Sequence, residues 1–215
     1  MFEPKKMLAN KKFRDSNQKL FITGDVVIPF KQFYIPSEGI NIRFLRRSLC
    51  VACTKSFEVV NIKNLTTQSI LNPNDIVFKN ILKSEYSPMN MFKTQQNDFL
   101  LCYNKIGFFI DKNGNRSRPN IFFKWNAVPK AFAYRSPYIY VITADYISIW
   151  YENDTISQKQ VIPGNSIRLL YHDENNIIYS KIEDGKQRLA TFDYCTDAVP
   201  IIQTQMQLPQ PQIKN

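Results

Sequence analysis

Two scarce residue types narrow the chemistry that this chain can perform. It has one histidine, His172, so the two-histidine motifs of zinc hydrolases cannot form. Its six glycines are scattered, and none belongs to a phosphate-binding loop or to a G-x-S-x-G nucleophile turn. The carboxylate pair Glu183–Asp184 lies in a glycine-containing turn, where solvent exposure is expected. We therefore predict a protein that is not an enzyme, with no catalytic residue, metal or cofactor.

Long apolar runs are also missing. A membrane-spanning helix needs about 20 apolar residues, whereas the apolar runs here are as short as Phe99–Tyr103. Residues Met1–Lys6 lack the apolar segment of a secretory signal. We therefore expect a cytoplasmic location, the cell cortex included.

Cysteine is scarce, with four in the chain. Cys50 and Cys53 have the C-x-x-C spacing of zinc and redox sites. They lie in an apolar run typical of a strand, where positions i and i+3 point to opposite faces. No second C-x-x-C follows. Buried free thiols are the better interpretation, and a zinc or redox site is the alternative.

Positive charge is abundant, with 28 Lys and Arg against 18 Asp and Glu and a net charge of +10. Such a balance suits acidic partners, whether nucleic acid, anionic lipid or an acidic protein face. Part of the charge lies in residues 1–24, which we predict to be a basic flexible leader. Aromatic residues follow strand periodicity and do not alternate with Lys and Arg, so no nucleic-acid partner is expected. A basic nucleic-acid-binding β protein is kept as an alternative.

The middle of the chain, residues 25–195, has an all-β pattern. Short runs rich in Val, Ile, Phe and Tyr are separated by Asn, Asp, Gly, Lys and Ser. Four hairpins are predicted, beginning at Leu49, Phe99, Tyr138 and Asn176. These positions lie 50, 39 and 38 residues apart, near the period of about 40–45 residues of a four-stranded propeller blade.

Further strands complete the predicted blades. They are expected before and after the hairpins, over residues 41–45, 67–71, 121–125, 130–134, 157–162 and 166–170. Four strands per unit favour a partial β-propeller of about four blades, and a β-sandwich is the competing fold. Residues 74–92 are the exception, with a short helix or an irregular connection expected. Residues 196–215 are rich in Gln and Pro and predict a disordered tail.

Several motifs follow one another in a fixed order, from Phe33–Pro36 through Leu49–Val60 and Gly107–Gly114 to Ile162–Asn165. This ordered series resembles the citron-homology domain of fungal Rho-type guanine nucleotide exchange factors. The resemblance implies a seven-bladed propeller, of which this chain would hold about four blades. Seven blades need about 280 residues, so we expect a longer propeller or a partner at the open ends. One departure is Ile147–Tyr151, where relatives have a charged strand.

The resemblance also implies a function. It indicates a non-catalytic regulatory module for protein–protein interaction in small-GTPase signalling and cell-wall integrity. Catalysis would lie upstream, in Dbl-homology and pleckstrin-homology modules that this chain lacks. The implied partner is a Rho-type small GTPase or a signalling scaffold, with peripheral membrane association through the parent protein. A truncated stand-alone paralogue, acting as a scaffold or competitor, is the alternative.

Four arginines are the candidate partner-binding residues. Arg46 and Arg47 lie in a turn between two predicted strands, and Arg116 and Arg118 lie in a later loop. Loops on a rigid scaffold display binding groups well, and arginine pairs bidentately with carboxylates. Solvated loop residues are the alternative. Trp125 and Trp150 fall in strand-like runs, so core packing is the better interpretation than an interface hot spot.

Overall fold

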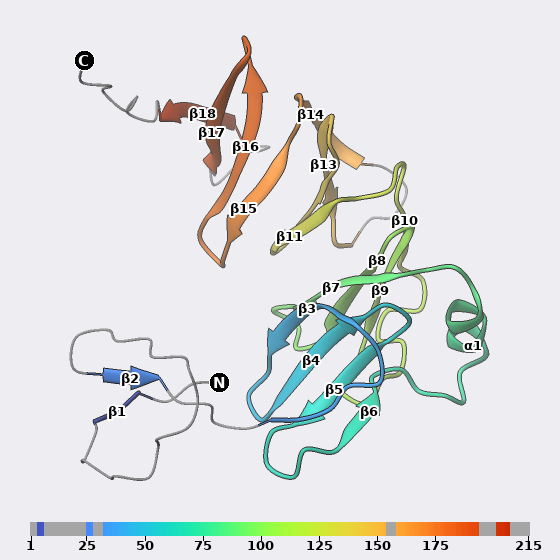
Figure 1. The fold of residues 1–215 in the computed structure, drawn as a ribbon. Coiled ribbons are helices and arrows are strands. Elements are labelled where there is room, and N and C mark those ends of the chain that lie inside the picture. The colour runs from blue at the N-terminus through green and yellow to red at the C-terminus, as the bar shows by residue number, and fades with distance from the viewer. Residues whose placement is uncertain (1–3, 7–24, 28–31, 154–157, 194–200, 207–215) are drawn as a thin grey trace. The chain divides into compact units, whose positions relative to one another are not determined.

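The computed structural model describes residues 4–6, 25–27, 32–153, 158–193 and 201–206 (Figure 1). The chain divides into two compact units, Met1–Pro36 and Ser37–Asn215. In the first unit, β1 (Pro4–Lys6) pairs antiparallel with β2 (Asp25–Val27). The predicted leader over residues 1–24 thus contains one strand, and its other residues lie outside the described ones.

The second unit contains four four-stranded antiparallel sheets, each with its strands in chain order, which we call blades 1 to 4 (Figure 1). Blade 1 has β3 (Gly39–Phe44), β4 (Ser48–Cys53), β5 (Phe57–Asn61) and β6 (Thr67–Ser69). Blade 2 has β7 (Pro88–Lys93), β8 (Phe99–Tyr103), β9 (Ile106–Ile110) and β10 (Phe122–Lys124). Blade 3 has β11 (Ala131–Arg135), β12 (Tyr138–Ile142), β13 (Tyr146–Tyr151) and β14 (Gln158–Pro163). Blade 4 has β15 (Arg168–His172), β16 (Ile177–Glu183), β17 (Lys186–Asp193) and β18 (Ile201–Met206).

The repeat of four-stranded units predicted from the sequence is confirmed, with two differences. Within residues 74–92 the expected short helix exists as α1 (Ile76–Lys83), but β7 follows it and was not predicted. In the expected disordered tail, Ile201–Met206 instead pair with β17 as β18. An edge strand needs backbone partners on one side only, which a Gln-rich segment can supply. Residues 196–200 and 207–215 lie outside the described ones.

Helix α1 is stabilised by a polar cap at its N-terminus and by the burial of one apolar face. The Asp75 side chain accepts a hydrogen bond from the Val77 N–H at 2.8 Å, which satisfies one of the free donors at the helix start. Phe78 and Ile81 are buried. With eight residues, this helix, the only one among the described residues, is too short to cross a membrane.

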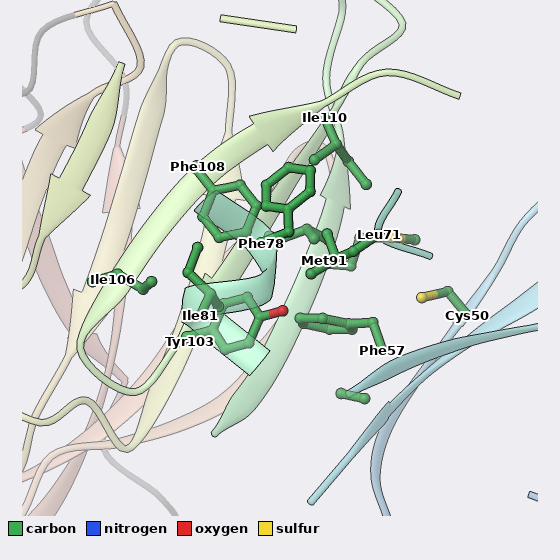
Figure 2. Close-up of a cluster of buried hydrophobic side chains, with 12 residues drawn as sticks. Cys50, Phe57, Leu71, Phe78, Ile81, Met91, Tyr103, Ile106, Phe108 and Ile110 are labelled. Carbon is green, nitrogen blue, oxygen red and sulfur yellow. The ribbon is translucent and has the colours of Figure 1, made fainter. Parts of the chain in front are cut away.

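Blades 1 and 2 pack face to face around a shared apolar cluster. Figure 2 shows Phe57 of β5 directed toward Tyr103 of β8, and their rings meet edge to face at 5.3 Å. Phe78 of α1 stacks on Phe108 of β9 at 5.4 Å, so the helix closes the same cluster. A four-stranded sheet that buries side chains on both faces requires such neighbours.

Blades 2 and 3 meet at an aromatic layer. The indole rings of Trp125 and Trp150 lie 5.6 Å apart, and Trp125 Nε1 donates to the Tyr103 carbonyl oxygen at 3.0 Å. Both tryptophans are buried, which confirms their predicted place in the core. Gly107 leaves room for this layer, because a Cβ at that position would overlap the Trp125 ring.

The first strand of each blade forms the inner row of the fold. Contacts join β3 to β7, β7 to β11, and β11 to β15. Strands β3 and β7 run in the same direction: Asn41 donates to the Met89 carbonyl at 3.3 Å, and Arg43 Nε donates to Asn90 Oδ1 at 3.2 Å. Their C-terminal ends, and the turns that follow them, therefore lie at one end of the row.

A polar clasp joins blades 1 and 2 away from the inner row. The Asn72 N–H donates to the Gly114 carbonyl at 3.0 Å, and the Asn72 side chain donates to Asn115 at 2.6 Å. Gly114 has a φ of +79°, and a Cβ there would overlap the Ile70 carbonyl oxygen. The clasp thus needs glycine for its backbone conformation and for its close approach to blade 1.

Alanine substitutions at Gly114 and Gly185 separate the effect of the backbone conformation from the effect of the close approach. Gly185 has a φ of +70°, but a Cβ added there would have no atom within 4 Å. We expect Gly185→Ala to lower the free energy of unfolding by about 1 kcal/mol from backbone strain alone. Gly114→Ala should lower it by about 1–3 kcal/mol more, because the Ile70 backbone must move. Urea unfolding of both variants measures the difference, and equal losses would show that the close approach does not exist.

Candidate functional site

Two adjoining cavities lie where the inner strands end. The first, about 270 Å³, is lined by the ends of β3, β7, β11 and β15, and the second, about 650 Å³, by the turns that follow the last three. They share Lys93, Tyr134 and Glu174. We call these two cavities the axial mouth. Its size falls within the range of pockets that hold small ligands or short peptide segments.

Arg43 and His172 meet inside the first cavity, from blades 1 and 4. Arg43 Nη2 lies 2.7 Å from His172 Nε2, although the residues are 129 positions apart in the chain. The Arg43 guanidinium also lies over the Phe92 ring at 5.0 Å, and the His172 ring meets the edge of Phe92 at 5.6 Å. Since an arginine can only donate, His172 accepts through Nε2 and carries its proton on Nδ1.

The environment of His172 favours its neutral form. Burial, and to a smaller extent the neighbouring Arg43 charge, lower its pKa from 6.5 to about 4, whereas Asp173 opposes the shift. The pKa of Arg43 is itself lowered by burial. The pair is therefore a neutral acceptor beside a partly desolvated cation, and that cation has no ion-paired carboxylate among the described residues.

Tyr134 forms a fixed wall between the two cavities. Its hydroxyl donates to Glu152 at 2.5 Å, and Ser136 Oγ donates to the same carboxylate at 3.4 Å. Glu152 is buried. Burial, together with the hydrogen bond to Glu152, raises the pKa of Tyr134. The Tyr134 ring lies 5.7 Å from that of Phe92, so the wall is continuous between blades 2 and 3.

The turn after β7 is anchored by Arg118. Asp98 accepts hydrogen bonds from Arg118 Nε and Ser117 Oγ, both at 2.8 Å, and from the Thr94 hydroxyl. Arg118 lies over the Phe109 ring at 3.9 Å. Both charged side chains are about nine-tenths buried. Burial alone would raise the pKa of Asp98, but the bonds from Arg118, Thr94 and Ser117 lower it on balance.

The four predicted arginines have different surroundings. Arg46 and Arg47 are exposed in the turn after β3, next to Leu45, which lines the first cavity. Arg118 is taken up by its contact with Asp98, while Arg116 pairs with Asp75 at 2.9 Å in the region of the clasp. Arg46 and Arg47 therefore follow a residue of the axial mouth in the chain but line neither cavity. Arg118 contacts Asp98 and thereby holds the turn after β7, which lines the mouth.

Sequence reasoning missed the residues inside the mouth. Arg43, Lys93 and Tyr134 lie in strands, where charged or polar residues resemble ordinary solvent-facing positions. His172 stood out only as the single histidine, without a role. The one available signal was the charge of Arg43 within a predicted strand. In the structure, Arg43 of β3 pairs with the buried Cys50 of β4.

The C-x-x-C pair is confirmed as buried free thiols. Burial raises the pKa of Cys50 to about 12 and also raises that of Cys53, which disfavours the reactive thiolate. Within the described residues no group of three or more His, Cys, Asp or Glu side chains is placed to hold a metal ion. Cys195 lies outside the described residues.

Comparison with known proteins identifies relatives over most of the chain. The family model of the CNH domain matches residues 10–173. Rho1 guanine nucleotide exchange factor 1 of Schizosaccharomyces pombe is 37% identical, over 79% of this chain and 13% of that protein. RHO1 GDP-GTP exchange protein 2 of Saccharomyces cerevisiae is 31% identical, over 74% of this chain and 12% of that protein. The chain thus spans a small part of these relatives.

The fold has a solved counterpart. The AfRom2 CNH domain superposes with a TM-score of 0.72 at 32% identity, covering 79% of this chain and 55% of that one. The partial β-propeller predicted from the sequence is therefore confirmed, and the chain corresponds to about half of that solved domain.

The ionisation of His172 can be followed directly, because the chain has no other histidine. In untagged protein, NMR titration of the imidazole ring protons should give a pKa of about 4. Arg43→Gln should raise this pKa, without restoring the ordinary value, because burial is the larger cause. Because the folded state keeps His172 neutral, the unfolded chain takes up a proton at a higher pH than the folded protein does. The stability that this difference provides is therefore complete above pH 6.5 and is lost as the pH falls toward 4. A titration near 6.5 would place His172 in solvent instead.

Arg118 and Arg116 offer a matched pair for stability. Arg118→Met leaves Asp98 as a buried carboxylate without its cation, so the free energy of unfolding should fall by about 3 kcal/mol at neutral pH. Arg116→Met removes a more exposed pair and should cost less than about 1 kcal/mol. Because the pKa of Asp98 is lowered, the Arg118 contribution is present above pH 3.8 and disappears in acid. Chemical denaturation at two pH values measures both effects, and equal losses would contradict the buried pair.

Proposed function

Because the chain belongs to the CNH domain family, we propose that it is a non-catalytic, regulatory protein–protein interaction module of a Rho-type guanine nucleotide exchange factor. The observation that carries the proposal is the axial mouth, a recess at one end of the inner strands that Arg43 and Arg135 line. Residues 25–195 are assigned to this module. The names of the relatives supply the exchange-factor context.

The charge at the mouth supports an acidic partner face. Three basic side chains and two carboxylates, Asp173 and Glu174, line the mouth, and two further arginines lie in the turn after β3. The basic residues are Arg43, Arg46, Arg47, Lys93 and Arg135. Positive and negative patches that match speed association and select partners. A Rho-type small GTPase or a signalling scaffold with an acidic surface fits this arrangement, and Arg46 and Arg47 are assigned to the contact.

The role assigned to this module is targeting rather than catalysis. It would bring the parent exchange factor to the cell cortex through its partner, and membrane association would be peripheral and indirect.

Two measurements on the parent factor test the function. Deletion of residues 25–195 should remove its cortical localisation, and Arg46→Gln with Arg47→Gln should weaken it. The matched control is Lys55→Gln with Lys186→Gln, which removes the same charge from exposed positions in or beside the hairpin turns at the opposite end of blades 1 and 4. The isolated chain should not speed GDP release from a Rho-type GTPase. Unchanged localisation after the deletion, or accelerated GDP release, would overturn the proposal.

A further inference from the structure

Arg43 is a cation without a negatively charged partner among the described residues. Its guanidinium contacts Asn90 and neutral His172, and neither carries a negative charge. Within the described part of the chain no carboxylate forms an ion pair with Arg43. Its Nη1 group makes no hydrogen bond there, and the side chain borders the first cavity. A partly buried charge without a counter-ion is costly, and an anion entering the cavity would offset that cost.

A second unpaired cation stands at the junction of the two cavities. Lys93 is exposed, borders both cavities, and has no ion-pair or hydrogen-bond partner among the described residues. An anion held by Arg43 in the first cavity and a second one held by Lys93 at its rim would both be balanced. Two such cations in the lining of one cavity suit a ligand with more than one negative group.

The remaining lining distinguishes a peptide from a phosphate ligand. The second cavity carries the side-chain amides of Gln95, Asn97 and Asn175, which both donate and accept hydrogen bonds. A peptide backbone offers both groups, whereas a phosphate only accepts. Glu174 also lines this cavity, and its carboxylate can accept a hydrogen bond from a peptide N–H.

The first cavity adds an apolar surface to the charges. Phe44, Met91 and Phe92 line it beside Arg43. Phe44 is 58% exposed, so its ring is available for contact. The combination suits a segment in which acidic and apolar side chains alternate, because extended peptide places alternate side chains on opposite sides.

We propose that the axial mouth binds an acidic, extended peptide segment of a partner protein, with one carboxylate paired to Arg43 and another to Lys93. This inference rests on the proposed function, since it names the kind of segment by which the module recognises its partner. Arg46 and Arg47 flank the entrance and guide the segment. Arg118 acts as a positioning residue, because it anchors the turn that carries Gln95 and Asn97.

The test uses the full chain and a fluorescein-labelled peptide with the sequence Leu-Glu-Leu-Glu-Leu, with a Gln-for-Glu peptide as the ligand control. Fluorescence anisotropy at about 150 mM salt, where long-range surface attraction is largely screened, should show binding of the Glu peptide alone. Arg43→Gln and Lys93→Gln should each weaken it about tenfold, the usual effect of losing a charged hydrogen bond. Lys55→Gln is the matched control for Lys93→Gln, since both lysines are exposed and unpaired among the described residues, and should change affinity less than about twofold.

Several outcomes would overturn this inference. They are no binding of the Glu peptide, equal loss with Lys55→Gln, or binding of phosphatidylinositol-bisphosphate vesicles that the mouth variants weaken instead. Because Arg43→Gln could disturb the inner strands, the exposed Lys93→Gln variant decides if the two disagree. Failure here, with cortical localisation still dependent on residues 25–195, would reject the peptide site and leave the proposed function standing.

Discussion

Burial of both faces of each sheet is the constraint from which the rest of this structure follows. In β9 and in the central residues of β12 and β13, consecutive side chains are buried, so both sides of these strands need covering. A sheet can have its faces covered only by another layer. The blades therefore stack face to face, as Phe57 on Tyr103 and Trp125 beside Trp150 show.

The same stacking creates the candidate site. Each blade contributes its first strand to the inner row, and the ends of all four inner strands line the same cavity. The turns after β3, β7, β11 and β15 are thereby gathered around the axial mouth. Contacts such as Arg118 with Asp98 and Tyr134 with Glu152 then fix the lining, which limits the entropy lost when a partner binds.

Local patterns made much of the fold predictable. Runs such as Phe99–Tyr103 and Tyr138–Ile142 are rich in aromatic and β-branched residues, and their spacing revealed the blades. Strand β7 was missed because Pro88–Lys93 contains proline, asparagine and two methionines, which favour no strand by themselves. Strand β18 was missed because it lies in a Gln-rich segment and pairs through its backbone with β17. The site was predictable only in part. Arg116 and Arg118 lie two positions apart, but each pairs with a carboxylate from a different segment of the chain, Asp75 and Asp98 respectively. No local pattern encodes such contacts.

Arg43 and His172 illustrate that limit most strongly, since 129 positions separate two side chains that meet in one cavity. Their contact also allows the most direct test of the fold and the site. A double-mutant cycle with Arg43→Gln, His172→Gln and the combined variant measures the coupling between them in the free energy of unfolding. We expect a coupling of about 1 kcal/mol at neutral pH, because the guanidinium donates to the neutral imidazole. Additive losses, with no coupling, would mean that the inner strands of blades 1 and 4 do not converge and that the axial mouth does not exist.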